Sequence, residues 1–313
     1  MNRQVLWFVL FTLLAACSSS GSSNTNNSPG NTGGTGNSIY TGGLIIDHRA
    51  VAGFDRGIPA EYLVEAKQRT IHYARTSHGR QIIEGALKLD EVSAATSTIY
   101  SFAVNEDGNA ATLPDAPGAL RMYDGNGNLS GNTYITPDLY WEEAEGMTAT
   151  RGVASTGLFD YSMWSWCGQV SYYSSASIQT YLDNLDTLEN EYVNMRFIYM
   201  TGHTDGTGTN GTLNINNNMI RQYVSDNNKV LFDFADIESY DPGGTLHADT
   251  GYQEGFCNWC KSWCDAHPSD CTDLPDSCGH TDSIPEAKLV CKLKAKAFWY
   301  MMARLAGWND PLY

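Results

Sequence analysis

Ser77 and His280 are residue types suited to nucleophilic catalysis, and both stand at the ends of predicted elements. Ser77 follows a β-prone run at residues 70–74 and precedes a stretch with helical spacing at 81–89. A serine at such a junction can project its hydroxyl from the end of a sheet, and the N–H groups that begin the helix can stabilise an oxyanion. Such a nucleophile needs a base, and His280 is the best-placed candidate because it lies just before the predicted closing helix, residues 285–306.

Each of these two residues also has an ordinary structural interpretation. Serine in a strand-to-helix turn is more often a helix N-cap than a nucleophile. His280 lies among cysteines and is equally explained as a loop histidine packed between disulfides. The pairing of the two side chains at one edge of the fold favours the catalytic hypothesis over either alternative.

The pattern of elements predicts a parallel sheet. Strand-like runs alternate with amphipathic helical stretches, and such alternation is typical of an α/β fold whose sheet is covered on both faces. The expected strands are residues 70–74, 161–166, 195–200 and 229–234, and the expected helices are residues 81–89, 177–192, 215–225 and 285–306. Residues 100–140 are rich in turn signals and are expected to form an insertion over one edge of the sheet.

Polar clusters follow all four expected strands: TSHG at 76–79, WCGQ at 166–169, TGHTDG at 201–206 and ADIE at 235–238. Ligands bind at the carboxyl ends of the strands in parallel sheets, so these clusters predict a shared site. Beside Ser77 and His280, the candidates for oxyanion or substrate binding are His78, Gly168, Gln169, His203 and Asp236.

Five stretches of the chain resemble the SGNH/GDSL hydrolase superfamily, and in particular an SGNH-like branch of secreted bacterial proteins. They are residues 74–79 (ARTSHG), 164–169 (WSWCGQ), 199–203 (YMTGH), 227–241 (NNKVLFDFADIESYD) and 303–308 (ARLAGW). The resemblance implies a three-layer α/β/α sandwich with a mainly parallel, flavodoxin-like sheet. It also implies a serine nucleophile, a histidine base, and an oxyanion hole built from the serine N–H, a glycine N–H and an asparagine side chain.

The chain departs from the superfamily pattern at three positions. The first motif is TSHG in place of GDS, and His203 stands where the superfamily has asparagine. Either His203 or Gln169 can donate the third hydrogen bond. The superfamily's acid lies three residues before its histidine, but here that position is Ser277, and Asp276 lies four before His280. The alternatives are therefore a triad with Asp276, a Ser-His dyad, or a triad completed by Asp236 or another acid.

A metal site is an alternative use of the same strand ends. His203, Asp205, Asp236 and His280 are ligand types that could converge there, and a metal-activated water would then replace the serine. No HExxH or comparable spacing supports this, and Asp124 to Asn128 imitates only the first half of a calcium loop, because Ile135 stands where that loop needs glutamate. We therefore expect no metal and no cofactor.

The first 38 residues predict export. Residues 1–17 combine Arg3, an apolar run and small residues before Cys17, which is typical of a lipoprotein signal whose cysteine is acylated. Residues 18–38 contain almost only Ser, Gly, Asn and Thr and predict a flexible linker, and residues 39–313 a single domain. An extracytoplasmic, lipid-anchored location follows, at the outer membrane or cell surface because serine follows Cys17, with no other membrane contact.

The remaining cysteines fit an oxidising compartment. Cys167 stands apart from a cluster of six at 257, 260, 264, 271, 278 and 291, which predicts disulfides and leaves Cys167 free. A haem-attachment variant at 257–261 and a zinc site are the alternatives for the cluster.

Composition excludes one class of partner and suits another. The formal charge of -16 argues against a nucleic-acid partner, because such proteins need a basic face. The 8 Trp, 18 Tyr and 10 Phe suit sugar stacking. The sequence therefore predicts a serine esterase acting on ester groups, with O-acyl groups of polysaccharides as a suitable substrate. The alternatives are a noncatalytic glycan-binding lipoprotein, and a lyase or metal hydrolase on the same strand ends.

Overall fold

The computed structural model describes residues 39–127, 131–247, 256–281 and 284–311. The expected signal sequence, its Cys17 and the linker lie outside these residues. The strands are β1 (Leu44–Ile46), β2 (Thr70–Arg75), β3 (Phe102–Asn105), β4 (Leu120–Asp124), β5 (Tyr161–Ser165), β6 (Arg196–Met200) and β7 (Val230–Phe232). The α-helices are α1 (Arg49–Asp55), α2 (Ala60–Ala66), α3 (Arg80–Ala94), α4 (Ala144–Ser155), α5 (Ser175–Glu191), α6 (Thr212–Asp226), α7 (Phe234–Ser239), α8 (Cys260–Ala266) and α9 (Leu289–Leu305).

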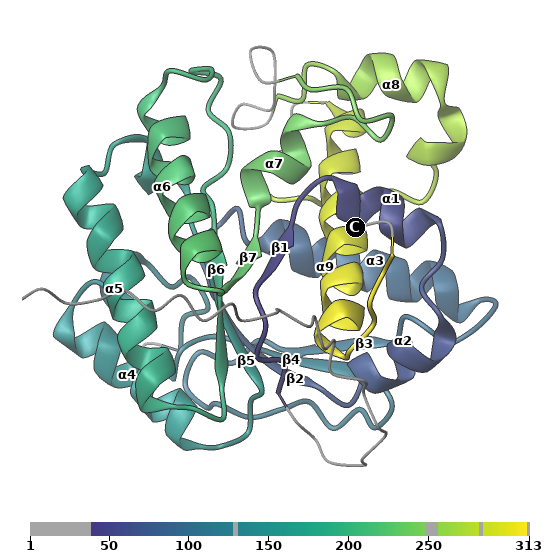
Figure 1. The fold of residues 1–313 in the computed structure, drawn as a ribbon. Helices are drawn as coiled ribbons and strands as arrows, with labels where there is room; N and C mark the ends of the chain where they lie inside the picture. The colour runs from purple at the N-terminus through teal and green to yellow at the C-terminus, as the bar shows by residue number, and fades with distance from the viewer. Residues whose placement is uncertain (1–38, 128–130, 248–255, 282–283, 312–313) are drawn as a thin grey trace, which may run out of the picture. The chain divides into compact units, whose positions relative to one another are not determined.

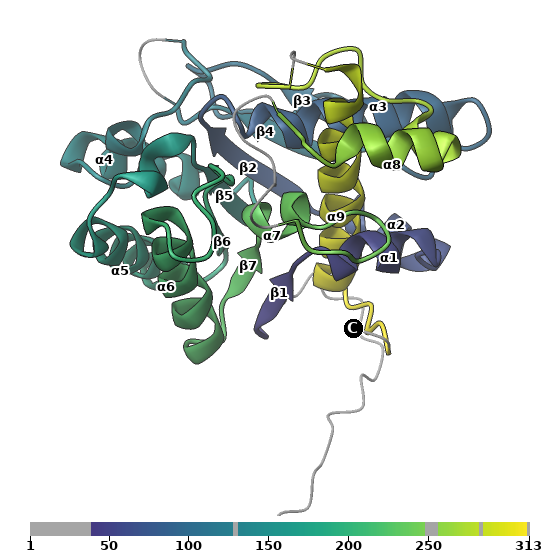
Figure 2. The ribbon, with the colours of Figure 1, turned by 90° about the horizontal axis from the view of Figure 1, so that it is seen from above.

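The seven strands form one sheet in which every pairing is parallel. Its order is β1-β7-β6-β5-β2-β4-β3. Helices α4, α5 and α6 lie on one face of the sheet, and α1, α3 and α9 lie on the other (Figure 1, Figure 2). The predicted three-layer α/β/α sandwich with a parallel central sheet is therefore confirmed.

Strand β2, next to the central strand β5, lies at the point where the order of the strands along the sheet reverses. From β2 the chain builds β3 and β4 on one side, and then crosses to β5 on the other side. The last residue of β2, Arg75, pairs with the last residue of β5, Ser165. In parallel sheets the crevice beyond the strand ends opens at such a switch point, so the segments after β2 and β5 are placed to share a site.

Two regions differ from the sequence-based expectation. Residues 100–140 are not only an insertion, because they contain β3 and β4, which form one edge of the sheet. These strands are short and β3 is mostly half-buried, so their apolar pattern is weak. The strand expected at 229–234 ends at Phe232, because the Asp233 carboxylate accepts a hydrogen bond from the Asp236 N–H and begins α7 there.

The closing helix α9 is the centre of its layer. It packs against α1, α2, α3 and α7, and most of its side chains are buried. A helix that is apolar on nearly all sides needs such a position to remove its surface from water. Within the described ranges, no helix has both the length and the apolar character of a membrane span.

The six clustered cysteines pair as Cys257–Cys260, Cys264–Cys271 and Cys278–Cys291. The disulfide prediction is confirmed, and Cys167 is the free cysteine among the described residues. Because all six thiols are used in these bonds, the haem-attachment and zinc alternatives for the cluster are wrong.

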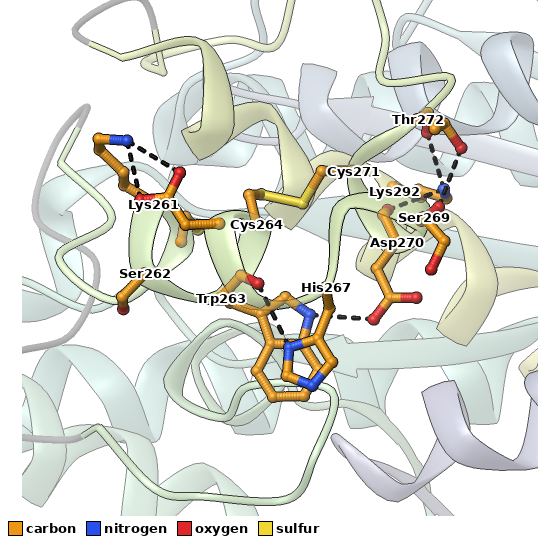
Figure 3. Close-up of a disulfide and its surroundings, with 12 residues drawn as sticks. Lys261, Ser262, Trp263, Cys264, His267, Ser269, Asp270, Cys271, Thr272 and Lys292 are labelled. Atoms are coloured by element: carbon orange, nitrogen blue, oxygen red, sulfur yellow. Dashed lines mark hydrogen bonds and ion pairs between the residues drawn. A yellow bond between two sulfur atoms is a disulfide. The ribbon is translucent and has the colours of Figure 1, made fainter.

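The second of these disulfides lies in a segment fastened to α9 (Figure 3). Trp263 stacks on His267 with ring centroids 3.9 Å apart and donates its indole N–H to Asp270 at 3.0 Å. Lys292, on α9, donates to the backbone carbonyls of Asp270 and Thr272, each at 2.9 Å. The segment before His280 is therefore held by the Cys264–Cys271 disulfide and by hydrogen bonds from Lys292 on α9.

A buried hydrogen-bond chain crosses the sheet at His72. Tyr140 OH lies 2.5 Å from Ser162 Oγ, Ser162 Oγ lies 2.8 Å from His72 Nδ1, and His72 Nε2 lies 2.8 Å from the Gly125 carbonyl. Since the carbonyl only accepts, Nε2 carries the proton and Nδ1 accepts from Ser162. Burial lowers the pKa of His72 from 6.5 to about 4, although the bond to Gly125 opposes this.

This histidine should make folding stability fall in acid. Because the folded-state pKa is below the unfolded value, unfolding takes up a proton between pH 6.5 and about 4. The contribution of His72 is complete above pH 6.5 and should fall by about 3 kcal/mol as pH drops through the folded pKa. Denaturant unfolding of the wild type and of His72→Gln should differ most above pH 6.5, and the difference should shrink toward pH 4. A difference in stability that does not change with pH would contradict the lowered pKa of His72. The control is His267→Gln, a substitution at an exposed histidine.

Candidate functional site

The turn after β2 places Ser77 at the carboxyl edge of the sheet. Thr76 N–H and Oγ1 both donate to the carbonyl of Ser165, at 3.1 and 3.0 Å, which continues the pairing of β2 with β5 by one residue. Gly79 then turns the chain into α3, and a Cβ at Gly79 would lie 2.6 Å from the Cβ of Arg75. Only glycine fits this turn, which leaves Ser77 half-buried with its hydroxyl beyond the strand end.

The structure brings His280 to this hydroxyl. His280 Nε2 lies 2.6 Å from Ser77 Oγ, although the two residues are 203 positions apart in the sequence. His280 has a φ of 59°, a left-handed conformation that is uncommon for residues other than glycine and that needs support from its surroundings.

Helix α3 and a disulfide supply that support. Glu84 accepts hydrogen bonds from the Gly279 N–H at 2.9 Å and the Ser277 hydroxyl at 2.7 Å. The amide group of Gln81 donates to the Gly279 carbonyl at 2.5 Å. Because Cys278 is bonded to Cys291 on α9, the backbone on the N-terminal side of His280 is held by two helices.

The free thiol of Cys167 is part of the same cluster. Its Sγ lies 3.3 Å from Ser77 Oγ and 3.2 Å from His78 Nδ1, and its N–H donates to Gln169 Oε1 at 2.8 Å. Burial alone would raise the pKa of this thiol, but hydrogen bonds with His203 and Ser77, and one from the Gly168 N–H, lower it below its usual value. Thus Gly168 and His203, expected to hold an oxyanion, both contact the sulfur.

Three imidazole rings stack beside the thiol, with His78 in the middle. His78 lies 3.7 Å from His203 and 4.0 Å from His280, measured between ring centroids, and the rings of both pairs are nearly parallel. Burial, followed by the neighbouring His203, His280 and Lys294, lowers the pKa of His78 far below its usual value. His78 is therefore neutral at pH 7.

His203 is the ring at the end of the stack opposite to His280. Its Nδ1 lies 2.7 Å from the carbonyl of Thr204, which fixes Nδ1 as the donor and directs the Nε2 lone pair inward. Burial alone would lower the pKa of His203, but the hydrogen bond with Cys167 and the charge of Glu238 raise it. The charged forms of His203 and Cys167 thus stabilise each other, which lowers the pKa of the thiol and raises that of the imidazole.

A buried ion pair between Glu238 and Lys294 contacts Thr204, the residue that follows His203. Glu238 accepts hydrogen bonds from the Thr204 N–H and hydroxyl, and its other oxygen lies 2.6 Å from Lys294 Nζ. Lys294 also donates to Gln81 and lies 3.6 Å from the centre of the Phe234 ring. Burial lowers the pKa of Lys294 to about 8, although Glu238 opposes the shift.

Two predicted acids lie elsewhere. Asp236 sits in the first turn of α7 and accepts from His48 N–H at 2.8 Å, with His48 Nδ1 at 2.6 Å, so it belongs to a cluster after β1. His48 stacks on Tyr240 there, beside a cavity of about 250 Å³. Asp276 is exposed, and in the described part of the chain no hydrogen bond or ion pair joins its carboxylate to His280.

The ligand types expected for a metal alternative are also separated. Asp205 bonds to Thr207, and Asp236 bonds to His48, so neither joins His203 and His280. Two other groups of described residues have ligand atoms close together: His78, Cys167 and His280, and Asp47, His48 and Asp236. Similarly, Asp124 in the calcium-like stretch is bonded to Arg75.

Sequence reasoning missed the part played by Cys167, Glu238 and Lys294. Cys167 was recognised only as a strand-end thiol without a partner. Lys294 is the clearest sequence signal of a buried ion pair, because it interrupts a helix whose side chains are mostly apolar and buried. A buried lysine requires a carboxylate nearby, but the partner's identity depends on the fold.

Comparison of the chain with protein-family models, with curated proteins and with solved structures finds no match.

Proposed function

We propose that this protein is a serine esterase of the SGNH/GDSL type that hydrolyses ester groups, with O-acyl groups of polysaccharides as its substrate class. The observation that carries the proposal is the 2.6 Å contact between Ser77 Oγ and His280 Nε2. This is the distance that a general base needs to take a proton from a nucleophile. The location of the pair at the switch point of a parallel sheet supports it.

The reaction divides between the two side chains. His280 Nε2 takes the hydroxyl proton as Ser77 Oγ attacks the ester carbonyl, and the imidazolium then gives the proton to the leaving alcohol. His280 next takes a proton from water, which attacks the acyl-serine and releases the acid. The oxyanion would be held by the N–H groups of Ser77 and Gly168, with His203 as a further donor when its Nε2 is protonated.

The proposal includes an extracytoplasmic domain tethered through a lipid on Cys17. Three disulfides support this location, because such bonds persist in oxidising compartments. Anchoring would hold the domain near surface polysaccharides. The lipid on Cys17 would be the part of the protein that contacts the membrane.

A fluorophosphonate probe tests the assignment directly, because it reacts with activated serines. The adduct is expected on the tryptic peptide of residues 76–80, which contains one serine, Ser77. Labelling should be lost in His280→Ala and after heat denaturation. An adduct on the peptide of residues 152–196, which contains Cys167, or no adduct on the native protein, would contradict the assignment.

A further inference from the structure

Three potential metal ligands meet at the proposed site. One ligand atom from each of His78, Cys167 and His280 lies within 4.8 Å of the other two. The sulfur and His78 Nδ1 are 3.2 Å apart. In a tetrahedral zinc site, a thiolate sulfur and an imidazole nitrogen are separated by roughly 3.6 Å, given Zn–S and Zn–N bonds of about 2.3 and 2.0 Å. The sulfur and His78 Nδ1 are therefore close to the separation that zinc needs. The His280 ring is stacked parallel to His78, so it has to rotate to turn its lone pair toward the same ion.

The chemistry of these donors suits a thiophilic transition metal. One thiolate and two neutral imidazoles form a soft ligand set, unlike the oxygen ligands that Mg²⁺ or Ca²⁺ prefer. Cys167 is available because the six clustered cysteines are used in disulfides. The buried carboxylate of Glu238 lies behind the histidine stack and would offset part of the added charge.

We propose that His78, Cys167 and His280 bind one thiophilic transition-metal ion, represented by Zn²⁺, and that the bound ion blocks hydrolysis. The ion takes the lone pair of His280 Nε2 that would otherwise accept the proton of Ser77. Ser77 Oγ lies 2.6 Å from this nitrogen and 3.3 Å from Cys167 Sγ, so the hydroxyl occupies the space that the ion needs. Metal binding and catalysis are mutually exclusive.

Binding is an exchange of a proton for a metal ion. A bond forms between the metal and the Cys167 sulfur, the S–H bond breaks, and the proton goes to solvent. The two imidazoles bind through neutral nitrogens and release no proton. No oxidation or reduction takes place. The blocking effect rests on the proposed esterase function, whereas the binding site does not.

Zinc binding is tested first in a chain that cannot hydrolyse by the proposed route. The full chain with Cys17→Ser and Ser77→Ala should bind one equivalent of Zn²⁺ in competition with a chromophoric chelator. Adding Cys167→Ser should weaken the affinity by at least about 100-fold, beyond the range typical for loss of an outer-shell partner. The matched control, His267→Gln, should leave the affinity unchanged. Absence of a bound ion, or equal affinity after Cys167→Ser, would overturn the site.

The blocking effect is tested with the hydroxyl present. One equivalent of Zn²⁺ should lower ester hydrolysis by the Cys17→Ser chain at least about tenfold, and a chelator should restore it. Zinc binding by a protein that hydrolyses no ester would support the metal site and overturn the esterase. Hydrolysis that persists with zinc bound, or that requires zinc, would overturn the block while leaving the site.

Discussion

Ser77→Ala is expected to lower kcat/KM for p-nitrophenyl esters by roughly 10⁶-fold, the scale of the loss in kcat seen when a catalytic serine is removed. Alanine cannot supply the oxygen that His280 deprotonates, and the remaining groups can only bind substrate. The fold should survive, because Ser77 is half-buried and the strand pairing continues through the backbone and side chain of Thr76. Steady-state kinetics with a thermal unfolding curve for each variant would measure both effects.

Two further variants sharpen this experiment. Ser155→Ala removes an exposed hydroxyl at the end of α4 and should change kcat/KM by less than about twofold. Cys167→Ala tests the rival nucleophile, because this thiol also contacts a histidine. Full activity in Ser77→Ala together with loss in Cys167→Ala would show that sulfur is the nucleophile and that the serine assignment is wrong.

Lys294→Met is expected to lower the free energy of unfolding by about 3 to 5 kcal/mol, the usual cost of removing one partner from a buried ion pair. Both Lys294 and Glu238 are fully buried, so the remaining carboxylate would lose its cation without gaining water. This is a large fraction of the stability of an ordinary domain. Urea unfolding followed by far-UV circular dichroism would measure the change.

The same helix provides the control. Lys296→Met removes a partly exposed ion pair with Asp55 and should cost less than about 1 kcal/mol. Adding Glu238→Gln to Lys294→Met should recover part of the lost stability, because it removes the unpaired charge. Equal effects of Lys294→Met and Lys296→Met, or a double variant no more stable than Lys294→Met alone, would contradict the ion-pair argument.

The sheet could be predicted because its central strands are buried on both faces. Such strands appear as nearly continuous apolar runs, as in β6 and β7, and the helices between them carry an apolar stripe. The edge strands β1 and β3 lack this signal, as does β4 beside β3, and β1 has only three residues. Their pairing depends on neighbours that are distant in the sequence.

The site could be predicted only in part. The rule that ligands bind at strand ends places Ser77 and the segment after β5 near one another. It does not distinguish neighbouring strand ends, so it could not separate Asp236, which bonds to His48, from the cluster around His78. The stacked histidines and the thiol contact depend on side-chain directions that no spacing in the sequence encodes.

The order of synthesis gives the central position of α9 a consequence for biogenesis. A ribosome makes the chain from the N-terminus, so α1, α2 and α3 emerge long before the helix against which they pack. Until α9 is synthesised, α1, α2 and α3 lack the helix against which they pack. Ser77 likewise lacks its contact with His280 until residue 280 is synthesised. An unfinished chain would therefore lack both the packing of this helix layer and the contact between Ser77 and His280.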